Sequence, residues 1–100
     1  MEITVYRCRD GNIYRQVISD CHLEKQDKWQ MDNNFFLVVP GDRQRVFVGD
    51  RIFPGVGPWV TDWDRFIPSQ VPQLLIVTQA VAYYVDGEHH HTEAAGGETL

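Results

Sequence analysis

The chain has 100 residues, 43% of them hydrophobic and 23% charged, and a formal net charge of −5 at pH 7. This length allows one domain with one modest core, and the composition excludes wholesale disorder. The acidic balance argues against tight binding to a nucleic-acid backbone, which requires clustered cations.

The charges are unevenly distributed along the chain. Residues 1–65 hold all nine Lys and Arg, whereas residues 66–100 hold four acids and no Lys or Arg. Arg43, Arg45 and Arg51 form the only loose cationic group, and such a group is more often a solvated turn than a phosphate-binding surface. We therefore expect an acidic surface that can lie beside DNA without binding it tightly.

The two cysteines, Cys8 and Cys21, are too few for a disulfide framework and form no CxxC motif. Because Met1 leads directly into a strand-like segment, we expect no signal peptide. The longest apolar stretch, residues 74–85, is far shorter than the roughly 20 residues of a membrane-spanning helix. We expect free thiols, no membrane association, and a soluble protein when it is made.

The first half of the chain predicts short strands. Residues 2–7 and 13–19 flank Asp10-Gly11-Asn12, a hairpin turn signal because glycine accepts positive φ. A polar third strand is expected from about residue 21 to residue 31, although its charges also suit a helical turn or an exposed loop. Residues 35–39 predict a buried strand, and residues 46–48 and 51–53 predict two shorter ones.

Residues 54–72 change character, because prolines and glycines alternate there with aromatic residues. Regular structure is expected to be short, with one helical turn near residues 61–65 capped by Thr61. Long irregular segments in compact domains are usually functional or disordered, and the aromatic residues argue against disorder.

The last part of the chain predicts a hairpin. Residues 73–85 are rich in β-branched side chains, Asp86-Gly87 is a two-residue turn signal, and residues 88–94 pair back. Residues 1–95 are thus predicted to form one all-β domain, a small barrel or compact sandwich of about seven short strands with a long aromatic and Pro-rich loop. Residues 96–100 are expected to be a flexible C-terminal tail.

His89-His90-His91 is the obvious candidate for a metal site. On a strand, His89 and His91 share one face and His90 points to the other, so the run supplies at most two ligands to one site. A stable zinc site needs three or four ligands. We expect no bound metal and no other cofactor.

Catalytic constellations are weak throughout the chain. Cys21 and His22 are neighbours on a strand and face opposite sides, and Asp62 and Asp64 sit in a Trp-rich loop where turn chemistry is the commoner role. No serine lies in a nucleophile elbow. We predict no catalytic residues and no enzymatic activity.

The aromatic loop remains as the candidate site. Phe53, Trp59, Trp63 and Phe66 are predicted to form a partner interface, since large aromatic residues anchor protein interfaces. The alternative is that these rings cap the open end of a small barrel. Both descriptions can hold for different rings.

The order of these features resembles a known family of phage proteins. It runs from Glu2-Ile3-Thr4-Val5-Tyr6 through Tyr14–Ile18 and an apolar strand ending at Pro40, to Gly49-Asp50-Arg51-Ile52-Phe53-Pro54-Gly55 and a His-rich ending. This layout is similar to that of the small minor capsid or head–tail joining proteins encoded among the head and neck genes of tailed phages and prophages. The resemblance does not extend to residues 59–72.

The resemblance implies a structural virion protein without catalysis. Such a protein forms a homo-oligomeric ring below the portal, closes the filled head and contacts portal, adaptor and tail-side proteins, while DNA passes nearby. Its location would be the host cytoplasm during assembly and then the virion. The main alternative is a monomeric β-barrel adaptor that binds a protein or peptide through its aromatic loop, with a histidine-based metalloenzyme a distant third.

Overall fold

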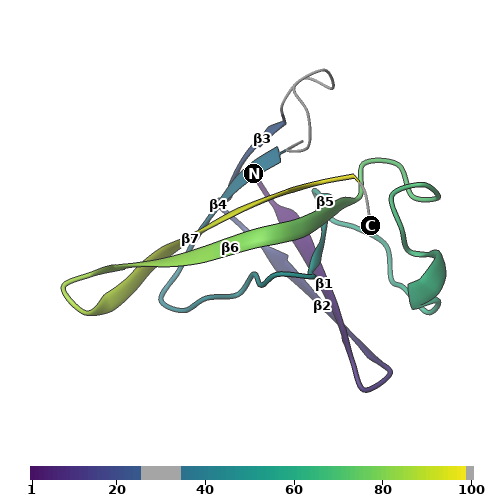
Figure 1. The fold of residues 1–100 in the computed structure, drawn as a ribbon, viewed down its shortest axis with the longest axis horizontal. Helices are drawn as coiled ribbons and strands as arrows, with labels where there is room; N and C mark the ends of the chain where they lie inside the picture. Colours follow the sequence, from purple (N-terminus) through teal and green to yellow (C-terminus); the bar gives the residue numbers. More distant parts are fainter. Residues whose placement is uncertain (26–34, 99–100) are drawn as a thin grey trace.

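The computed structural model describes residues 1–25 and 35–98. These residues form one antiparallel sheet of seven strands in the spatial order β2-β1-β5-β6-β7-β4-β3 (Figure 1). The strands are β1 (Ile3–Arg9), β2 (Asn12–Ile18), β3 (His22–Lys25), β4 (Phe35–Pro40), β5 (Arg51–Pro54), β6 (Leu75–Val85) and β7 (Glu88–Gly97). A one-turn 3-10 helix, η1 (Trp63–Arg65), lies between β5 and β6. The predicted all-β fold with about seven strands is confirmed, and the single sheet is open rather than a closed barrel.

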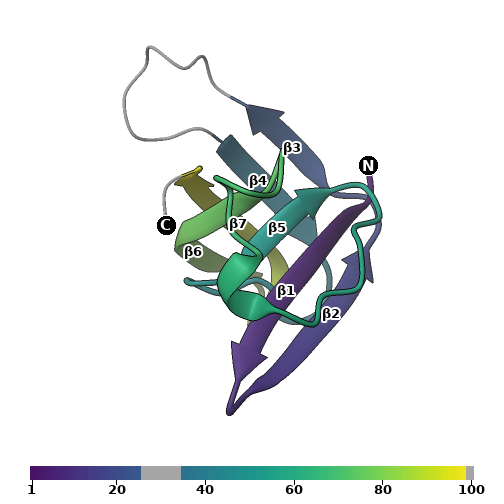
Figure 2. The ribbon, with the colours of Figure 1, turned by 90° about the vertical axis from the view of Figure 1, so that its right-hand side faces the viewer.

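The sheet curls because its two edge strands, β2 and β3, are consecutive in the chain. The N–H of Cys21 donates to the carbonyl oxygen of Met1 (2.9 Å), and the N-terminal ammonium of Met1 donates to the carbonyl oxygen of Cys21 (2.8 Å). Met1 leads into β1 and Cys21 into β3, so these bonds join the two sides of the sheet (Figure 2). The main core lies inside the curl and takes side chains from distant strands, among them Ile3, Val5, Ile18, Phe35, Leu37, Val39, Leu75 and Val77.

A second, smaller core lies on the other face of β1, under residues 55–74. Tyr6, Phe66 and Leu74 are buried there. Successive strand residues point to opposite faces, so Val5 enters the main core while Tyr6 enters the second one. Both faces of β1 are therefore covered, which explains why its first four residues are all buried.

Both predicted hairpin turns are confirmed. The φ angles are 51° and 78° at Asp10 and Gly11, and 52° and 80° at Asp86 and Gly87. Two successive residues with positive φ match the right-handed twist of the strands that such a turn connects.

The predicted strand at residues 46–48 is wrong. Val46 is buried, but the following residues turn around the carboxylate of Asp50. The N–H of Phe47 donates to Asp50 Oδ2 (2.9 Å), and the N–H of Asp50 donates to the carbonyl oxygen of Phe47 (3.0 Å). A turn held by a buried side chain overrides the strand propensity of three apolar residues.

Three other boundaries also differ from the predictions. The helical turn is preceded by Asp62 rather than capped by Thr61, and the Asp62 side chain makes no capping hydrogen bond. The tail predicted from residue 96 is wrong at its start, because Gly96 and Gly97 are buried residues of β7. Of the polar strand expected over residues 21–31, β3 covers residues 22–25, and residues 26–31 lie outside the described part of the chain.

The β6–β7 hairpin extends well past the rest of the sheet (Figure 1). β5 pairs with β6 only at Leu75 and Ile76, and the last backbone bond from the 49–50 turn reaches Val77. Beyond that point β7 is the only described strand that pairs with β6. We call residues 78–93 of this hairpin the arm.

Candidate functional site

The four aromatic residues predicted as an interface take different positions. Phe66 is only 4% exposed, and its ring centroid lies 4.5 Å from that of Tyr6 in an edge-to-face contact. Phe53 and Trp63 pack against the same small core and are partly buried. These three rings pack on the outer face of the sheet rather than capping the open end of a barrel, and Phe66 offers almost no surface to a partner.

Trp59 is the exception, with 82% of its surface exposed. The Arg15 guanidinium carbon lies 4.3 Å from the centre of the indole, and Arg15 Nη2 donates to the carbonyl oxygen of Gly57 (2.6 Å). The hydroxyl of Tyr6 donates to the carbonyl oxygen of Pro58 (2.8 Å). The backbone before Trp59 is thus bonded to β1 and β2, so the indole projects from a fixed base.

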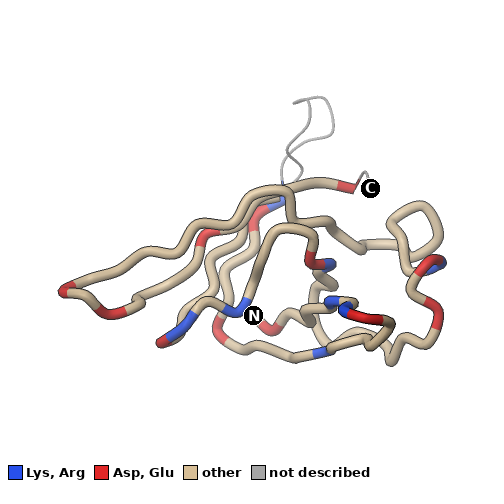
Figure 3. The backbone as a smooth tube through the Cα atoms, turned by 60° about the horizontal axis from the view of Figure 1, so that its bottom comes forward, with Lys and Arg blue, Asp and Glu red and all other residues tan. Residues whose placement is uncertain are grey.

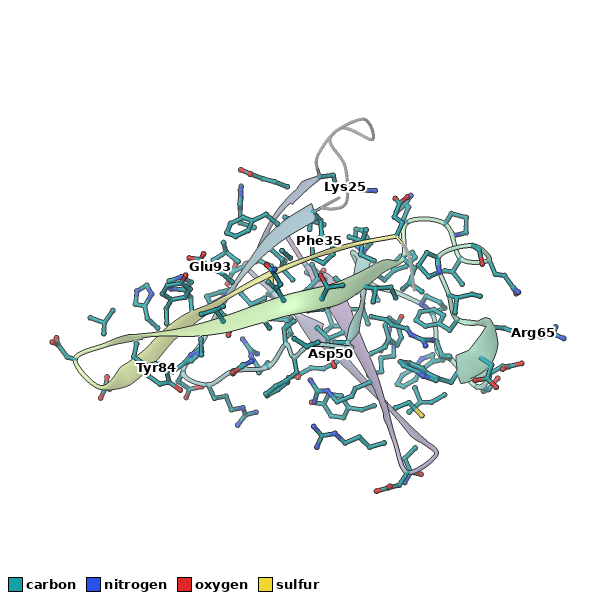
Figure 4. All side chains as sticks on the ribbon, in the orientation of Figure 1. Lys25, Phe35, Asp50, Arg65, Tyr84 and Glu93 are labelled. Carbon is teal, nitrogen blue, oxygen red and sulfur yellow. The ribbon has the colours of Figure 1, made fainter. Side chains whose placement is uncertain are left out.

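The arm exposes a second group of large apolar side chains, which the sequence analysis did not identify. They are Val81, Tyr83, Tyr84 and Val85, with exposed fractions between 42% and 64%. Figure 4 shows Tyr84 and Glu93 on the arm, far from Arg65 at the other end of the molecule. The sequence did indicate that part of this strand would lack a partner. The predicted strand of thirteen residues is longer than any strand predicted beside it.

The histidines lie on the arm. The sequence predicts that His89 and His91 share one face of the strand, and in the structure they do not. A register shift between Tyr83 and Tyr84 pairs Tyr83 with His91 and Tyr84 with His89, leaving His90 as the extra residue. Tyr83 and Tyr84 point to opposite faces, so their partners do too. The bulge is therefore the reason that the prediction of a shared face for His89 and His91 is wrong.

Each of the paired histidines supports the arm locally. The His91 ring stacks on Tyr83 with centroids 4.8 Å apart, and its Nε2 lies 2.9 Å from Glu93 Oε2. His89 Nδ1 lies 2.7 Å from the carbonyl oxygen of Gly41, which ties the arm to the loop after β4. Within residues 1–25 and 35–98, no three His, Cys, Asp or Glu side chains form a potential metal site.

A cationic and aromatic surface surrounds the tip of the β1–β2 hairpin and the 47–49 turn. We call it the cationic face, and its members are Arg7, Arg9, Tyr14, Phe47 and Val48. The Arg7 guanidinium carbon lies 4.6 Å from the Phe47 ring centre and 5.5 Å from that of Tyr14. A groove of about 550 Å³ runs along the hairpin tip, and its lining includes the acid Asp10 beside Arg7, Arg9 and Tyr14.

A buried ion pair fixes the base of the cationic face. Arg7 Nε and Nη2 donate to the two carboxylate oxygens of Asp50, at 2.7 and 2.6 Å. Asp50 is 1% exposed. These hydrogen bonds raise the pKa of Arg7, although partial burial acts in the opposite direction. The pair therefore links β1 to the turn that carries Phe47 and Val48.

The arginines expected to form a loose group are dispersed. Arg45 Nη2 donates to the carbonyl oxygen of Pro40 (2.7 Å), whereas Arg43 is exposed beside the arm. Arg51 is buried with its guanidinium carbon 3.8 Å from the Trp63 ring centre, and burial lowers its pKa. No phosphate-binding surface is built from these three residues.

The thiols and carboxylates considered for catalysis belong to different elements: Cys8 lies on β1, Cys21 precedes β3, and Asp62 and Asp64 lie at η1. Cys8 and Cys21 are free, and burial raises the pKa of the Cys21 thiol. Asp62 and Asp64 are exposed, and Asp62 lies 3.6 Å from the Arg65 side chain.

No helix within residues 1–25 and 35–98 combines the length and the apolar character needed to cross a bilayer. Comparison with family models, curated proteins and solved structures finds no match for this chain.

Proposed function

We propose that this chain is a structural subunit of the tailed-phage neck, which assembles with copies of itself into a ring between the filled head and the tail. The observation that carries the proposal is the arm, which exposes two tyrosines and two valines of β6 beyond the end of the pairing of β6 with β5. Val81, Tyr83 and Val85 alternate along β6 and share one of its faces, whereas Tyr84 lies on the other. Contiguous apolar surface on a small domain is typical of an interface. The virion setting comes from the layout that the chain shares with minor capsid and head–tail joining proteins.

The shape of the monomer supports assembly through unlike surfaces. The arm leaves the sheet in one direction, and the segment between β5 and β6, which contains η1, lies at the other end of the molecule (Figure 1). A contact between two different surfaces of identical subunits closes into a ring when the rotation allows it. In such a ring Trp59 is free to contact a portal, adaptor or tail-side protein.

The charge distribution agrees with a DNA passage. The arm carries Asp86, Glu88 and Glu93 and no Lys or Arg (Figure 3). A surface of this sign repels the phosphate backbone, so DNA can pass without being held. The proposed role needs no catalysis and no cofactor.

Light scattering after gel filtration and negative-stain microscopy test the proposal. The purified chain is measured over a range of concentrations, alone and with portal, adaptor and tail-side proteins. Rings or partner complexes are expected. Trp59→Ala should weaken the partner contact by about 2 kcal/mol, close to 30-fold, if Trp59 is an anchor.

The control variant is Trp63→Ala, because Trp63 packs on the second core and its loss should destabilise the monomer instead. Circular dichroism separates the two effects. A wild-type chain that stays monomeric with every partner contradicts the neck role.

A second candidate function is a monomeric adaptor that binds a peptide or protein through the aromatic loop. The specific observation in its favour is the exposure of Trp59 on a fixed base, with Arg15 against the ring. A chain that remains monomeric and binds a partner in a Trp59-dependent way would favour this function over the ring.

A further inference from the structure

Arg51 is a buried arginine that uses only part of its guanidinium group. The residue is 7% exposed, and Nη1 donates to the carbonyl oxygens of Trp63 (2.7 Å) and Phe66 (2.6 Å). Nε is buried without a hydrogen-bond partner, and no described residue accepts a hydrogen bond from Nη2. An unpaired buried donor is costly, because it has lost its hydration and gained no hydrogen bond in return. This orphaned donor points to an acceptor from outside the chain.

The geometry of the unused edge identifies the acceptor. Nε and Nη2 form one edge of the planar guanidinium group, and the two parallel N–H groups on this edge match the two oxygens of a carboxylate. Arg7 binds Asp50 in this way, with Nε and Nη2 donating to the two carboxylate oxygens at 2.7 and 2.6 Å. No described Asp or Glu forms an ion pair with Arg51. The same edge of Arg51 therefore lacks the carboxylate that it fits.

Arg51 lines a groove of about 290 Å³ at the place where β5 begins. Residues 7–9 of β1 continue past this point without a partner on β5, and they form one wall of the groove. The 47–49 turn and Trp63 form the other walls. Because Nη1 is occupied by two carbonyl oxygens, the part of the guanidinium group that Arg51 can offer to a ligand in the groove is the edge formed by Nε and Nη2.

The charges around the groove leave Arg51 as the uncompensated cation. The ion pair between Arg7 and Asp50 is neutral, and Arg9 is followed in the chain by an acid that lines the neighbouring groove. Asp64 favours the charged form of Arg51, but burial has the larger effect and lowers the pKa of Arg51. An anion bound directly to the guanidinium group would offset this desolvation.

The apolar walls of the groove define the rest of the ligand. Trp63 lies against one face of the guanidinium group, with its ring centre 3.8 Å from Cζ of Arg51, so the cation is held in place before a ligand arrives. Phe47 and Val48 line the same groove. The volume of about 290 Å³ accommodates a small group only. A carboxylate attached to a short apolar group fits both the donor edge and these walls.

We propose that Arg51 is the anchor of a carboxylate-binding site in this groove. One oxygen of the ligand accepts from Nη2 and the other from Nε, while the apolar group of the ligand lies against Phe47 and Val48. The carboxylate belongs to a small aliphatic or aromatic acid or to the C-terminus of a partner chain. The site is built from one copy of the chain, so it does not depend on the proposed ring.

Nitrogen-15 NMR of the arginine Nε–H groups tests the site in the full-length chain, with the Arg51 signal assigned by its loss in Arg51→Lys. Phenylacetate and propionate are titrated at constant ionic strength, and phenylacetamide serves as the uncharged match of phenylacetate. Both carboxylates should shift the Arg51 signal to saturation, whereas phenylacetamide should leave it unchanged. A signal that responds to no carboxylate, as when a buried water occupies Nε, overturns the proposal.

Further probes identify the anion and its source. Chloride and inorganic phosphate should bind at least about tenfold more weakly than phenylacetate, because chloride lacks two coplanar oxygens and a phosphate dianion is repelled by the neighbouring Asp50 and Asp64. Equal binding of chloride or phosphate overturns the assignment to a carboxylate. A tripeptide that ends in phenylalanine with a free carboxylate is the last probe. Tighter binding of this peptide than of phenylacetate assigns the site to a partner's C-terminus, and the reverse order assigns it to a free small acid.

Two substitutions of exposed valines place the site in the groove. Val48 lines the groove and is 64% exposed, so Val48→Glu adds a competing carboxylate there without disturbing the core. It should weaken the binding of phenylacetate at least about tenfold. Val56 is 62% exposed and does not line the groove, so Val56→Glu is the matched control and should bind like the wild type. Equal binding by Val48→Glu and Val56→Glu overturns the proposed location.

Arg51→Lys tests the anchor itself. Lysine retains the positive charge and a donor for the carbonyl oxygens of Trp63 and Phe66, but it lacks the edge formed by Nε and Nη2. Calorimetric titration with phenylacetate should show binding weakened at least about tenfold, and circular dichroism shows whether the variant is folded. A folded Arg51→Lys that binds like the wild type overturns the role of Arg51. If this variant does not fold, the comparison of Val48→Glu with Val56→Glu still decides. A chain that binds phenylacetate but never forms rings retains this site and contradicts only the proposed neck function.

Discussion

Replacing Asp50 with alanine should be among the most destabilising single substitutions where β1 meets the 47–49 turn. The carboxylate is 2% exposed and accepts three hydrogen bonds, two from Arg7 and one from the N–H of Phe47. The substitution removes all three and leaves the Arg7 charge without its partner. It also releases the turn that presents Val48.

The magnitude follows from the burial of the two partners. Breaking a buried ion pair by removing one member costs about 3–5 kcal/mol. The Arg7 side chain is 19% exposed and can recover some hydration, so we expect the lower end, about 3 kcal/mol. For a domain of this size, that corresponds to a fall of about 12–24 °C in Tm.

Urea denaturation followed by circular dichroism measures this loss in the free energy of unfolding. The protein concentration is kept in a range over which the urea midpoint does not depend on concentration. Asp50→Asn is the matched variant, because it keeps the volume and one acceptor for the Phe47 N–H, and it should cost clearly less. A double-mutant cycle with Arg7→Met should show coupling of about 2 kcal/mol. A loss below about 1 kcal/mol for Asp50→Ala, or additive effects of the two substitutions, would refute this account of the turn.

Two further predictions concern the strands and the thiol. Gly96→Ala should lower the free energy of unfolding by about 2–3 kcal/mol in urea denaturation, because a Cβ at this position collides with the carbonyl oxygen of Ile76. A loss below about 0.5 kcal/mol would contradict the tight pairing of β6 and β7. Burial raises the pKa of the Cys21 thiol, so the unfolded chain loses this proton first, near pH 8.5, and the free energy of unfolding should fall as the pH rises above that value. Cys21→Ala should show a smaller fall between pH 8 and 9.5, and an identical fall would contradict the assignment to this thiol.

Two hairpins continue past the rest of the described sheet. The β6–β7 hairpin extends beyond the pairing of β6 with β5 and of β7 with β4, and the β1–β2 hairpin extends beyond the pairing of β1 with β5. The base of the β1–β2 hairpin is held by Arg7, which bonds to Asp50 and lies against two aromatic rings. Both hairpins depend on tight turns with two positive φ angles, so their directions are set by rigid elements.

Much of the local structure was predictable from the sequence, because it depends on interactions between neighbouring residues. Asp10-Gly11 and Asp86-Gly87 specify turns through backbone conformations that few other residues adopt. The β-branched run after Leu74 specifies a strand over a helix. The apolar run from Phe35 specifies a strand, but the prediction that both of its faces are buried is wrong, because only Phe35, Leu37 and Val39 are fully buried. Local preference therefore decided the all-β class and the position of both hairpins.

Only the tertiary structure decided which side chains are buried and which are available to a partner. Phe66 and Trp59 have the same surroundings of proline and apolar residues in the sequence, yet Phe66 meets Tyr6 in the second core and Trp59 remains in solvent. Asp50 bonds to the N–H of Phe47 in the turn that replaces the strand expected at residues 46–48, and Arg7, 43 positions earlier in the chain, holds the Asp50 carboxylate there. The bulge at His90 separates His89 from His91 because the register of β6 against β7 is set over the whole hairpin. Long-range contacts carry no periodic signal along the chain, so the exposed arm and the cationic face could be recognised only once the sheet was assembled.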